Sequence, residues 1–155
     1  MPPGSLVMLL SGPNLNLLGE REPAVYGNST LADHVAAAGE EAARYGLVVE
    51  HLQSNHEGEL VEAVHAARGR AVALVINPGA LTHYSWSLRD ALASFEGPVV
   101  ELHLSNPASR ETWRANSVVS DVATGTIAGF GGAGYRLALA AVADLLKLTD
   151  APVEH

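Results

Sequence analysis

The sequence predicts an α/β protein built on a parallel sheet of five strands with helices on both faces. Two observations indicate this fold class. Short apolar runs recur along the 155-residue chain, and segments of helical length with apolar residues at helical spacing separate them. This alternation is typical of βαβ units, in which right-handed crossovers join parallel strands.

The first part of the chain accounts for two strands and one helix. The run LVMLL within 5–12 is short, apolar and closed by a glycine, as expected of a buried strand. Thr30 and Asp33 have the Thr-x-x-acid spacing of a capped helix start, and Gly46 ends this helix. A second strand, 47–53, follows directly, because LVVEHLQ is rich in residues that favour strands.

The middle of the chain predicts a second helix, the clearest strand and a third helix. Ser54 and Glu57 have the spacing of a capping box. The helix after them has an apolar face made by Leu60, Val61, Val64 and Ala67. The run AVALVINP at 71–78 is apolar until a Pro-Gly pair stops it, which is typical of a central parallel strand. A short helix over 86–95 ends at a Gly-Pro pair.

The last part of the chain supplies two more strands, 99–107 and 124–132, and a long amphipathic helix over 133–148. The glycine-rich GFGGAGY at 129–135 could suit an anion at a helix start. Its late position favours tight packing and a helix entry instead.

The chain is expected to form one domain over 1–155, because it contains no internal repeat and no linker. Disordered tails are expected at 1–5 and 149–155. Five strands joined in this way fit a flavodoxin-like three-layer sandwich with the strand order 2-1-3-4-5.

The composition excludes several classes of function. Lys and Arg number 9 against 17 Asp and Glu, a net charge of −8, which argues against nucleic acid and anionic membranes as partners. The absence of cysteine removes disulfides, thiolate nucleophiles and cysteine-based zinc sites. The N-terminal MPPGS lacks a signal-peptide pattern, and no apolar run approaches the ~20 residues of a membrane span, so we expect a cytoplasmic protein. Lys147 is the only lysine, which limits Schiff-base chemistry.

The carboxyl ends of the strands are the expected ligand site, because open α/β sheets bind ligands where the strand order reverses. Polar residues follow three of the predicted strands. They are Asn14, Arg21 and Tyr26 after the first strand, Asn77 and His83 after the third, and Glu101, His103, Ser105 and Asn106 at the end of the fourth. The predicted strand order brings these ends side by side, so we expect one shared site.

Each of these residues also has a purely structural interpretation. Asn14 is typical of a turn, Tyr26 of half-buried packing and Arg21 of a solvated run of charges. Glu101 and His103 are two positions apart on a strand and therefore share one face of the sheet. They fit a general acid with its carboxylate, and they also fit a satisfied core pair.

The remaining histidines and the known short motifs add no second site. His34, His51, His56 and His65 are interpreted as helix-surface or loop residues. HLQSNH at 51–56 is only a weak metal-binding pattern. The sequence has no G-x-S-x-G elbow, and neither a Walker loop nor G-x-G-x-x-G follows the first strand.

Five segments stand out by their order and spacing. They are SGPNLNLLGEREPAVYG, QSNHEGEL, VINPGALTHYSWSLRDAL, VVELHLSNP and SRETWRANS. Together they closely resemble type II 3-dehydroquinate dehydratases, which are small flavodoxin-like enzymes of the shikimate and quinate pathways. The resemblance extends over roughly residues 6–146.

The resemblance implies dehydration of 3-dehydroquinate to 3-dehydroshikimate by anti elimination through an enolate. Such a reaction needs a base for the proton next to the ketone and donors for the enolate oxygen. By resemblance Tyr26 is the base, Arg21 favours its phenolate form, and Asn14 stabilises the enolate through a bound water. By the same resemblance, His103 should protonate the departing hydroxyl, and Glu101 should orient His103 and set its charge.

The family's substrate-binding residues correspond here to Asn77, His83, Leu104, Ser105 and Arg114. Asn77, Leu104 and Ser105, with backbone N–H groups, would hold the carboxylate of the substrate. His83 and Arg114 would hold its ring hydroxyls.

The resemblance also has implications for assembly. Asp90 matches an aspartate that the family donates to a neighbouring subunit's site, and the family forms homododecamers from trimers. Residues 19–26 match the family's mobile lid. No cofactor and no metal are implied.

The sequence departs from the family pattern at some positions. Ser11 stands where Asn is common, Pro107 replaces a β-branched residue, Ala133 replaces a frequent Gln, and RANSVVS replaces a stretch richer in His and Tyr. None of these changes removes a proposed catalytic residue, but they bear on the pose of Arg114.

Two other functions stay open: a flavodoxin-like electron carrier, which would need a Ser/Thr-rich phosphate loop after the first strand, and a catalytically silent relative.

Overall fold

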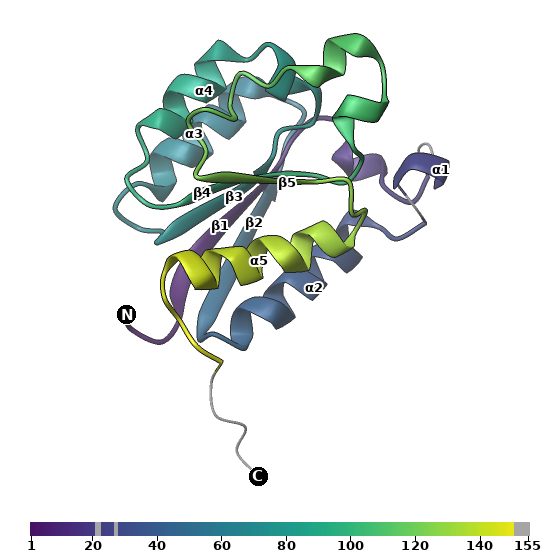
Figure 1. Ribbon diagram of the computed structural model, residues 1–155. Coiled ribbons are helices and arrows are strands. Elements are labelled where there is room, and N and C mark those ends of the chain that lie inside the picture. Colours follow the sequence, from purple (N-terminus) through teal and green to yellow (C-terminus); the bar gives the residue numbers. More distant parts are fainter. Residues whose placement is uncertain (21–22, 27, 151–155) are drawn as a thin grey trace.

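The computed structural model describes residues 1–20, 23–26 and 28–150, and of residues 25 and 26 only the backbone. Its centre is one sheet of order β2-β1-β3-β4-β5 in which neighbouring strands run parallel (Figure 1). The predicted fold class and strand order are therefore confirmed. The strands are β1 (Ser5–Ser11), β2 (Leu47–Gln53), β3 (Ala73–Asn77), β4 (Val99–His103) and β5 (Gly125–Ala128).

The connections between the strands are helical. The α-helices are α1 (Pro23–Tyr26), α2 (Leu31–Ala43), α3 (Glu57–Ala67), α4 (Trp86–Ala93) and α5 (Ala133–Leu145). Short 3-10 helices are η1 (Leu15–Leu17), η2 (Gly79–His83), η3 (Pro107–Ser109) and η4 (Thr112–Ala115).

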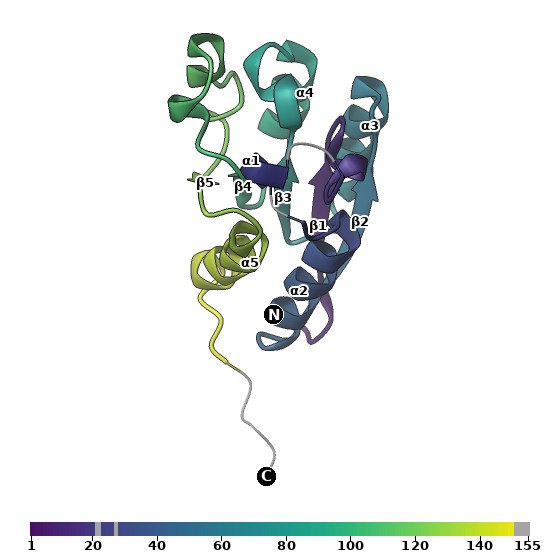
Figure 2. The same cartoon turned by 90° about the vertical axis from the view of Figure 1, so that its right-hand side faces the viewer.

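Two helical layers cover the sheet. The pair α2 and α5 packs on one face, and the pair α3 and α4 packs on the other (Figures 1 and 2). Leu9 and Val75 point into the first core, and their neighbours Leu10 and Ile76 point into the second. Because alternate residues of a strand face opposite sides, the central strands are buried on both faces. This explains their unbroken apolar sequences.

The two predicted capping boxes have different outcomes. Thr30 caps α2 as predicted: its side chain accepts from the N–H of Asp33, and the Asp33 carboxylate accepts from the N–H of Thr30. The capping box predicted for α3 is wrong. Ser54 Oγ accepts from the N–H of His56 and donates to Glu59 Oε2 at 2.6 Å.

The predicted partner of Ser54 is engaged elsewhere. Glu57 Oε2 accepts a hydrogen bond from Ser85 Oγ at 2.6 Å, so the carboxylate links the start of α3 to the start of α4. His56 is the N-cap residue of α3, and its side chain makes no capping hydrogen bond.

Two histidines predicted to lie on helix surfaces or in loops do not. His34 is 7% exposed and stacks on Tyr135 of α5 with ring centroids 5.2 Å apart. Gly132 makes this possible, because a Cβ atom there would overlap the His34 ring. His51 is part of β2, and its Nε2 lies 2.8 Å from Ser11 Oγ. His56 and His65 are exposed, as predicted.

The loops after β1 and β3 touch at the carboxyl edge of the sheet. The N–H of Gly12 donates to the carbonyl of Asn77 at 2.8 Å. A Cβ atom on Gly12 would lie 2.5 Å from the carbonyl oxygen of Pro78. Only glycine allows this approach, which brings the two loops into contact.

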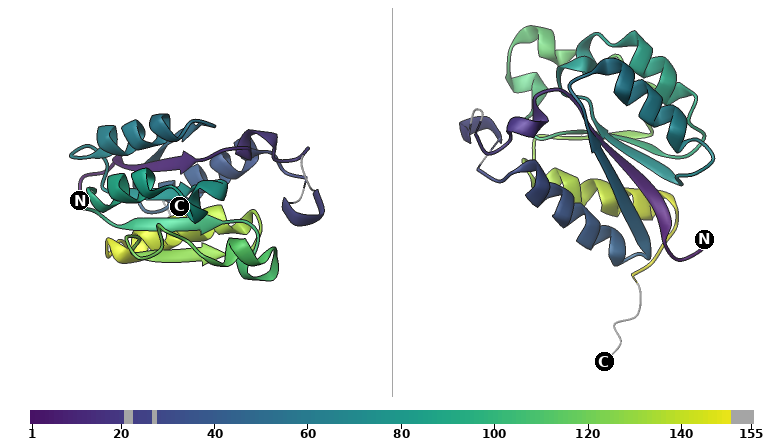
Figure 3. Two further views of the ribbon diagram at one scale, coloured as in Figure 1. Left: turned by 90° about the horizontal axis from the view of Figure 1, so that it is seen from above. Right: turned by 180° about the vertical axis from the view of Figure 1, so that it is seen from behind.

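The opposite edge of the sheet holds the N-terminus. The N–H of Gly4 donates to the carbonyl of Gly46 at 2.8 Å, and Arg44 pairs with Asp150 at 2.8 Å. Figure 3 shows β2 at one side of the sheet and α1 projecting beyond the carboxyl ends of the strands. Among the helices of the described residues, none has both the length and the apolar character to cross a membrane.

Candidate active site

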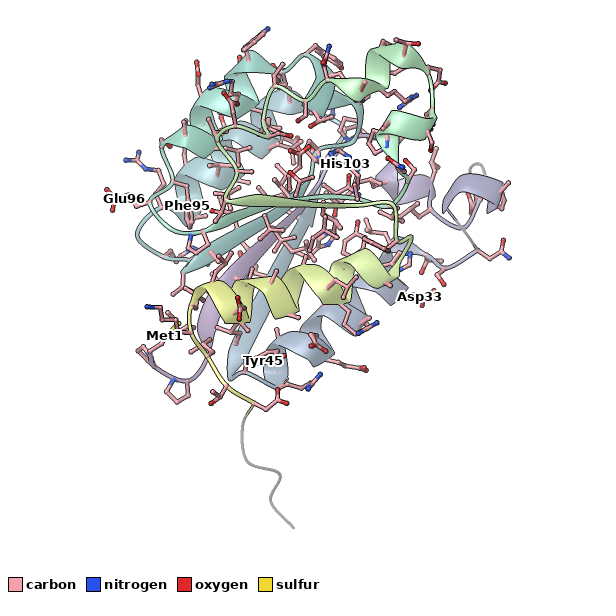
Figure 4. The ribbon with its side chains drawn as sticks, viewed as in Figure 1. Met1, Asp33, Tyr45, Phe95, Glu96 and His103 are labelled. Carbon is pink, nitrogen blue, oxygen red and sulfur yellow. The ribbon has the colours of Figure 1, made fainter. Side chains whose placement is uncertain are left out.

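A pocket of about 570 Å³, including its open mouth, lies beyond the carboxyl ends of β1, β3 and β4. The strand order reverses here, which is where open α/β sheets bind their ligands. Figure 4 places His103 toward this edge, far from Phe95 and Glu96 at the other. The pocket lining includes seven of the predicted residues: Asn14, Asn77, His83, His103, Leu104, Ser105 and Arg114.

Asn14 reaches the pocket from an unusual backbone conformation. Its φ is 69°, in the left-handed region that asparagine tolerates better than most residues. Its N–H donates to Asn55 Oδ1 at 2.9 Å. That same oxygen accepts from Gln53 Nε2 at 3.2 Å. The loop after β2 therefore fixes the loop after β1.

Asn77 is the last residue of β3 and is 3% exposed. Its Oδ1 accepts from the N–H of Gly79 at 3.2 Å, and its Nδ2 donates to the hydroxyl of Tyr135 at 3.5 Å. An amide nitrogen carries two N–H groups. One of them is therefore left for a ligand in the pocket.

Glu101 and His103 form a buried pair on β4. Alternation along the strand puts both side chains on one face, as the sequence predicts. His103 Nε2 donates to Glu101 Oε2 at 2.5 Å. Glu101 is 1% exposed, whereas His103 lines the pocket. The other ring nitrogen of His103, Nδ1, is therefore the one available to a ligand.

The carboxylate of Glu101 is surrounded by donors. Burial raises the pKa of Glu101, but hydrogen bonds from His103, Ser120 and Thr82 together outweigh burial and bring this pKa to about 2. Ser117 Oγ adds a further donor, 3.0 Å from Oε2. Glu101 is therefore an anion at neutral pH, despite its burial.

His83 and Arg114 meet around one aromatic ring. The His83 ring packs edge-on against Trp113 at 5.1 Å, and the Arg114 guanidinium lies over the face of Trp113 at 4.1 Å from the ring centroid. His83 Nδ1 is 2.6 Å from the carbonyl of Asn116, and Arg114 Nε donates to Glu111 Oε2 at 2.5 Å. Trp113 thus supports both pocket side chains.

Arg110 also lines the pocket and is not among the residues predicted from the sequence. Its Nη1 donates to Ser105 Oγ at 3.3 Å. The usable signal was its position: Arg110 follows β4 closely, at the sheet edge where the other candidates gather. The hydroxyl residues around Glu101 were missed as well, because single Ser and Thr residues in loops carry no motif.

Among the described residues, Glu101 and Asp90 were predicted for the site but do not line this pocket, and Glu101 contacts it through His103. Arg21 lies outside the described residues, and Tyr26 is the last residue of α1, described by its backbone alone. Asp90 is exposed on α4. Gly19 and Asn28, on either side of the segment that carries Arg21 and Tyr26, lie close together. A Cβ atom on Gly19 would lie 2.9 Å from the carbonyl oxygen of Asn28.

The chemistry of this pocket is that of anion binding and proton transfer. Amide, guanidinium and imidazole groups line it, and an ionised carboxylate backs one imidazole. Within the described part of the chain, no three or more His, Asp or Glu side chains are grouped to hold a metal ion. The fold and the site together define a doubly wound α/β enzyme with its pocket at the switch point of the sheet.

Comparisons with known proteins give the family. A family model described as Dehydroquinase class II matches residues 5–143. The 3-dehydroquinate dehydratase 2 of Pseudomonas putida is 54% identical over 142 residues, which cover 92% of this chain and 95% of that protein. A catabolic 3-dehydroquinase of Penicillium rubens is 52% identical over 136 residues, 88% of each chain.

A solved structure agrees. The type II dehydroquinase from Propionibacterium acnes matches with a TM-score of 0.88 and 42% identity, over 93% of this chain and 99% of that one. The chain belongs to the class II dehydroquinase family.

Proposed function

We propose that this protein dehydrates 3-dehydroquinate to 3-dehydroshikimate by anti elimination through an enolate. The observation that carries the proposal is the buried Glu101–His103 pair at the edge of a pocket rich in amide and cationic groups. The substrate is a carboxylic acid with ring hydroxyls, which such groups bind well. Relatives of more than half identical sequence are named for this reaction.

The first half of the reaction removes a proton next to the ketone. Tyr26 is the base, and Arg21 favours its phenolate form, because a nearby positive charge stabilises an anion. Asn14 supports the enolate oxygen through a bound water. The left-handed backbone of Asn14 and its tie to Asn55 support this role, because they fix a side chain at the pocket.

The second half expels the hydroxyl group. The protonated His103 ring delivers a proton from Nδ1, while Nε2–H stays bonded to Glu101. The ionised carboxylate stabilises the imidazolium before transfer and holds the neutral ring afterwards in its Nε2–H form. One strand thus presents the acid in a fixed orientation.

The remaining lining residues bind the substrate. Asn77, with Leu104 and Ser105 and their backbone N–H groups, holds the carboxylate, and His83 and Arg114 hold the ring hydroxyls. Arg110 adds a second guanidinium to the same pocket.

The proposal extends to assembly and location. The protein forms a homododecamer of four trimers, in which Asp90 of one subunit completes the site of a neighbour. An exposed Asp90 on α4, away from its own pocket lining, supports this arrangement. The enzyme acts in the cytoplasm, in the shikimate or the catabolic quinate pathway.

The direct test follows the ultraviolet absorbance of the conjugated product. Purified protein mixed with 3-dehydroquinate should give rising absorbance that survives treatment with borohydride, because no Schiff base forms. The Tyr26→Phe variant should lose turnover but keep binding, since only the proton-accepting oxygen is removed. A wild-type protein without turnover would refute the function, and a Tyr26→Phe variant with near-normal kcat would refute the base.

A further inference from the structure

Hydroxyl groups from two loop regions meet on the Glu101 carboxylate. Ser120 Oγ donates to Oε1 at 2.7 Å, and Thr82 Oγ1 donates to Oε2 at 2.8 Å. Ser117 Oγ lies 3.2 Å from Oε1 and 3.0 Å from Oε2. Thr82 belongs to η2, whereas both serines follow η4, so the chain folds two separate segments around one side chain. We call Thr82, Ser117 and Ser120 the hydroxyl cage.

We propose that the hydroxyl cage consists of positioning residues that keep the proton of the Glu101–His103 pair on His103 and set the acid strength of its ring. The proposal deepens the proposed function and rests on it, because it takes His103 as the acid of the dehydration. None of the three residues reaches the substrate in this assignment; they act through Glu101.

The count of hydrogen-bond donors favours an ionised Glu101. The Ser120 hydroxyl donates its proton to Oε1, while Oε2 receives Thr82 and His103. Thr82 and Ser117 also lie 2.6 Å apart and can share one proton between their oxygens. A neutral carboxyl group would replace these charge-assisted hydrogen bonds by weaker ones between neutral groups.

The same donors weaken the hold of Glu101 on the histidine proton. A carboxylate that accepts hydrogen bonds from the cage hydroxyls attracts the imidazolium less strongly than a bare carboxylate does. Removing one donor therefore concentrates the negative charge and makes the pair hold its proton more tightly. The alkaline limb of the pH–rate profile then moves to higher pH, and proton delivery to the leaving hydroxyl slows.

Other charged and titratable groups face the same pair within the described residues. His83 on η2 and Arg114 on η4 line the space beside Glu101 and His103, and Arg110 lines the pocket in front of His103. These three residues are not substituted in the variants below. A shift of the alkaline limb can then be assigned to the cage.

The test compares Ser120→Ala and Thr82→Val with the wild-type enzyme. The control is Ser94→Ala. In the wild type the Ser94 hydroxyl donates to the carbonyl of Ala91 at the end of α4. We measure the pH dependence of kcat/KM with 3-dehydroquinate and the titration of the His103 ring by NMR. In both cage variants we expect the alkaline limb and the ring's titration midpoint to rise by about half a pH unit or more, with kcat severalfold lower.

Two further results identify the mechanism. The acid limb of the pH–rate profile, which reports the base, should not move. Thr82→Ser, unlike Thr82→Val, should show the wild-type profile, because serine keeps the hydroxyl. An unmoved or lowered midpoint in both cage variants would overturn the proposal, even if kcat falls. A wild-type protein that does not turn over 3-dehydroquinate would refute the proposed function instead, and the NMR midpoints would still decide the effect of the cage.

Discussion

The pKa of Glu101 illustrates how far hydrogen bonds can shift the ionisation of a buried carboxyl group. Its pKa is about 2 in the folded protein and 4.5 ordinarily. Ionisation of Glu101 therefore stabilises the fold above about pH 4.5, and this contribution is lost as the pH falls toward 2. The full difference corresponds to ~3 kcal/mol of unfolding free energy.

We predict that lowering the pH from 5 to 3 removes about 2 kcal/mol of unfolding free energy through Glu101 alone. Urea unfolding at both pH values measures it. Glu101→Gln serves as the control, because its amide does not titrate and its decrease should be smaller by that amount. Equal decreases in the two proteins would contradict the assignment.

Trp113 is a second residue whose role depends on its contacts. It is 53% exposed, yet it carries the Arg114 guanidinium and the edge of His83. A cation–π contact at an exposed site is worth about 0.5–1 kcal/mol. We predict that Trp113→Leu raises KM for 3-dehydroquinate about threefold with kcat nearly unchanged, while Trp113→Phe, which keeps an aromatic face, raises it less. A fall in kcat alone would mean that Trp113 does not act through binding.

At the scale of elements, the contact between the β1 and β3 loops is the critical junction. Gly12→Ala would drive a methyl group against the Pro78 carbonyl. We predict a loss of about 1–3 kcal/mol of stability and about tenfold or more in kcat/KM, because the change would move Asn14, in the loop after β1, away from Asn77 at the end of β3.

The matched control is Gly39→Ala on α2, where a Cβ atom would meet nothing within 4 Å. That change should stabilise the protein by about 0.5–1 kcal/mol, since alanine favours helices. Thermal unfolding and steady-state kinetics of both variants separate packing from propensity. If Gly12→Ala behaves like Gly39→Ala, the junction does not matter.

The elements also show where local sequence rules stop. The capping box at Thr30 was predictable because both partners lie within one turn. The same spacing at Ser54 failed because Ser85, distant in sequence, binds the Glu57 carboxylate. His34 was misjudged for a similar reason: its burial depends on Tyr135 and Gly132 in α5. Contacts between elements decide such cases, and a local pattern does not contain them.

At the scale of the whole molecule, strand order and pocket position followed from the sequence. Continuous apolar strands, helix-length separators and polar residues at strand ends are enough to predict the sheet and its switch point. The hydroxyl cage was not predictable, because single Ser and Thr residues in loops acquire their neighbours only when the loops fold over β4.

The proposed assembly makes a prediction at this scale. If Asp90 acts in a neighbour's site, co-expressing Asp90→Ala with His103→Ala should regenerate about a quarter of the sites, although each variant alone is inactive. The measurement is the specific activity of the mixed oligomer, with mass by light scattering. No recovered activity in a mixed dodecamer would confine Asp90 to its own subunit, and a stable monomer would refute the assembly.

The close approach of Gly19 and Asn28 has a consequence for protein engineering. The base is proposed to lie between these two points, whereas the acid is built into β4. Because the two ends of 19–28 nearly meet, this stretch can be exchanged between relatives as a cassette without altering the separation of β1 and α2. Chimeras of this kind would vary the proton-abstracting half of the enzyme while the proton-donating half stays constant.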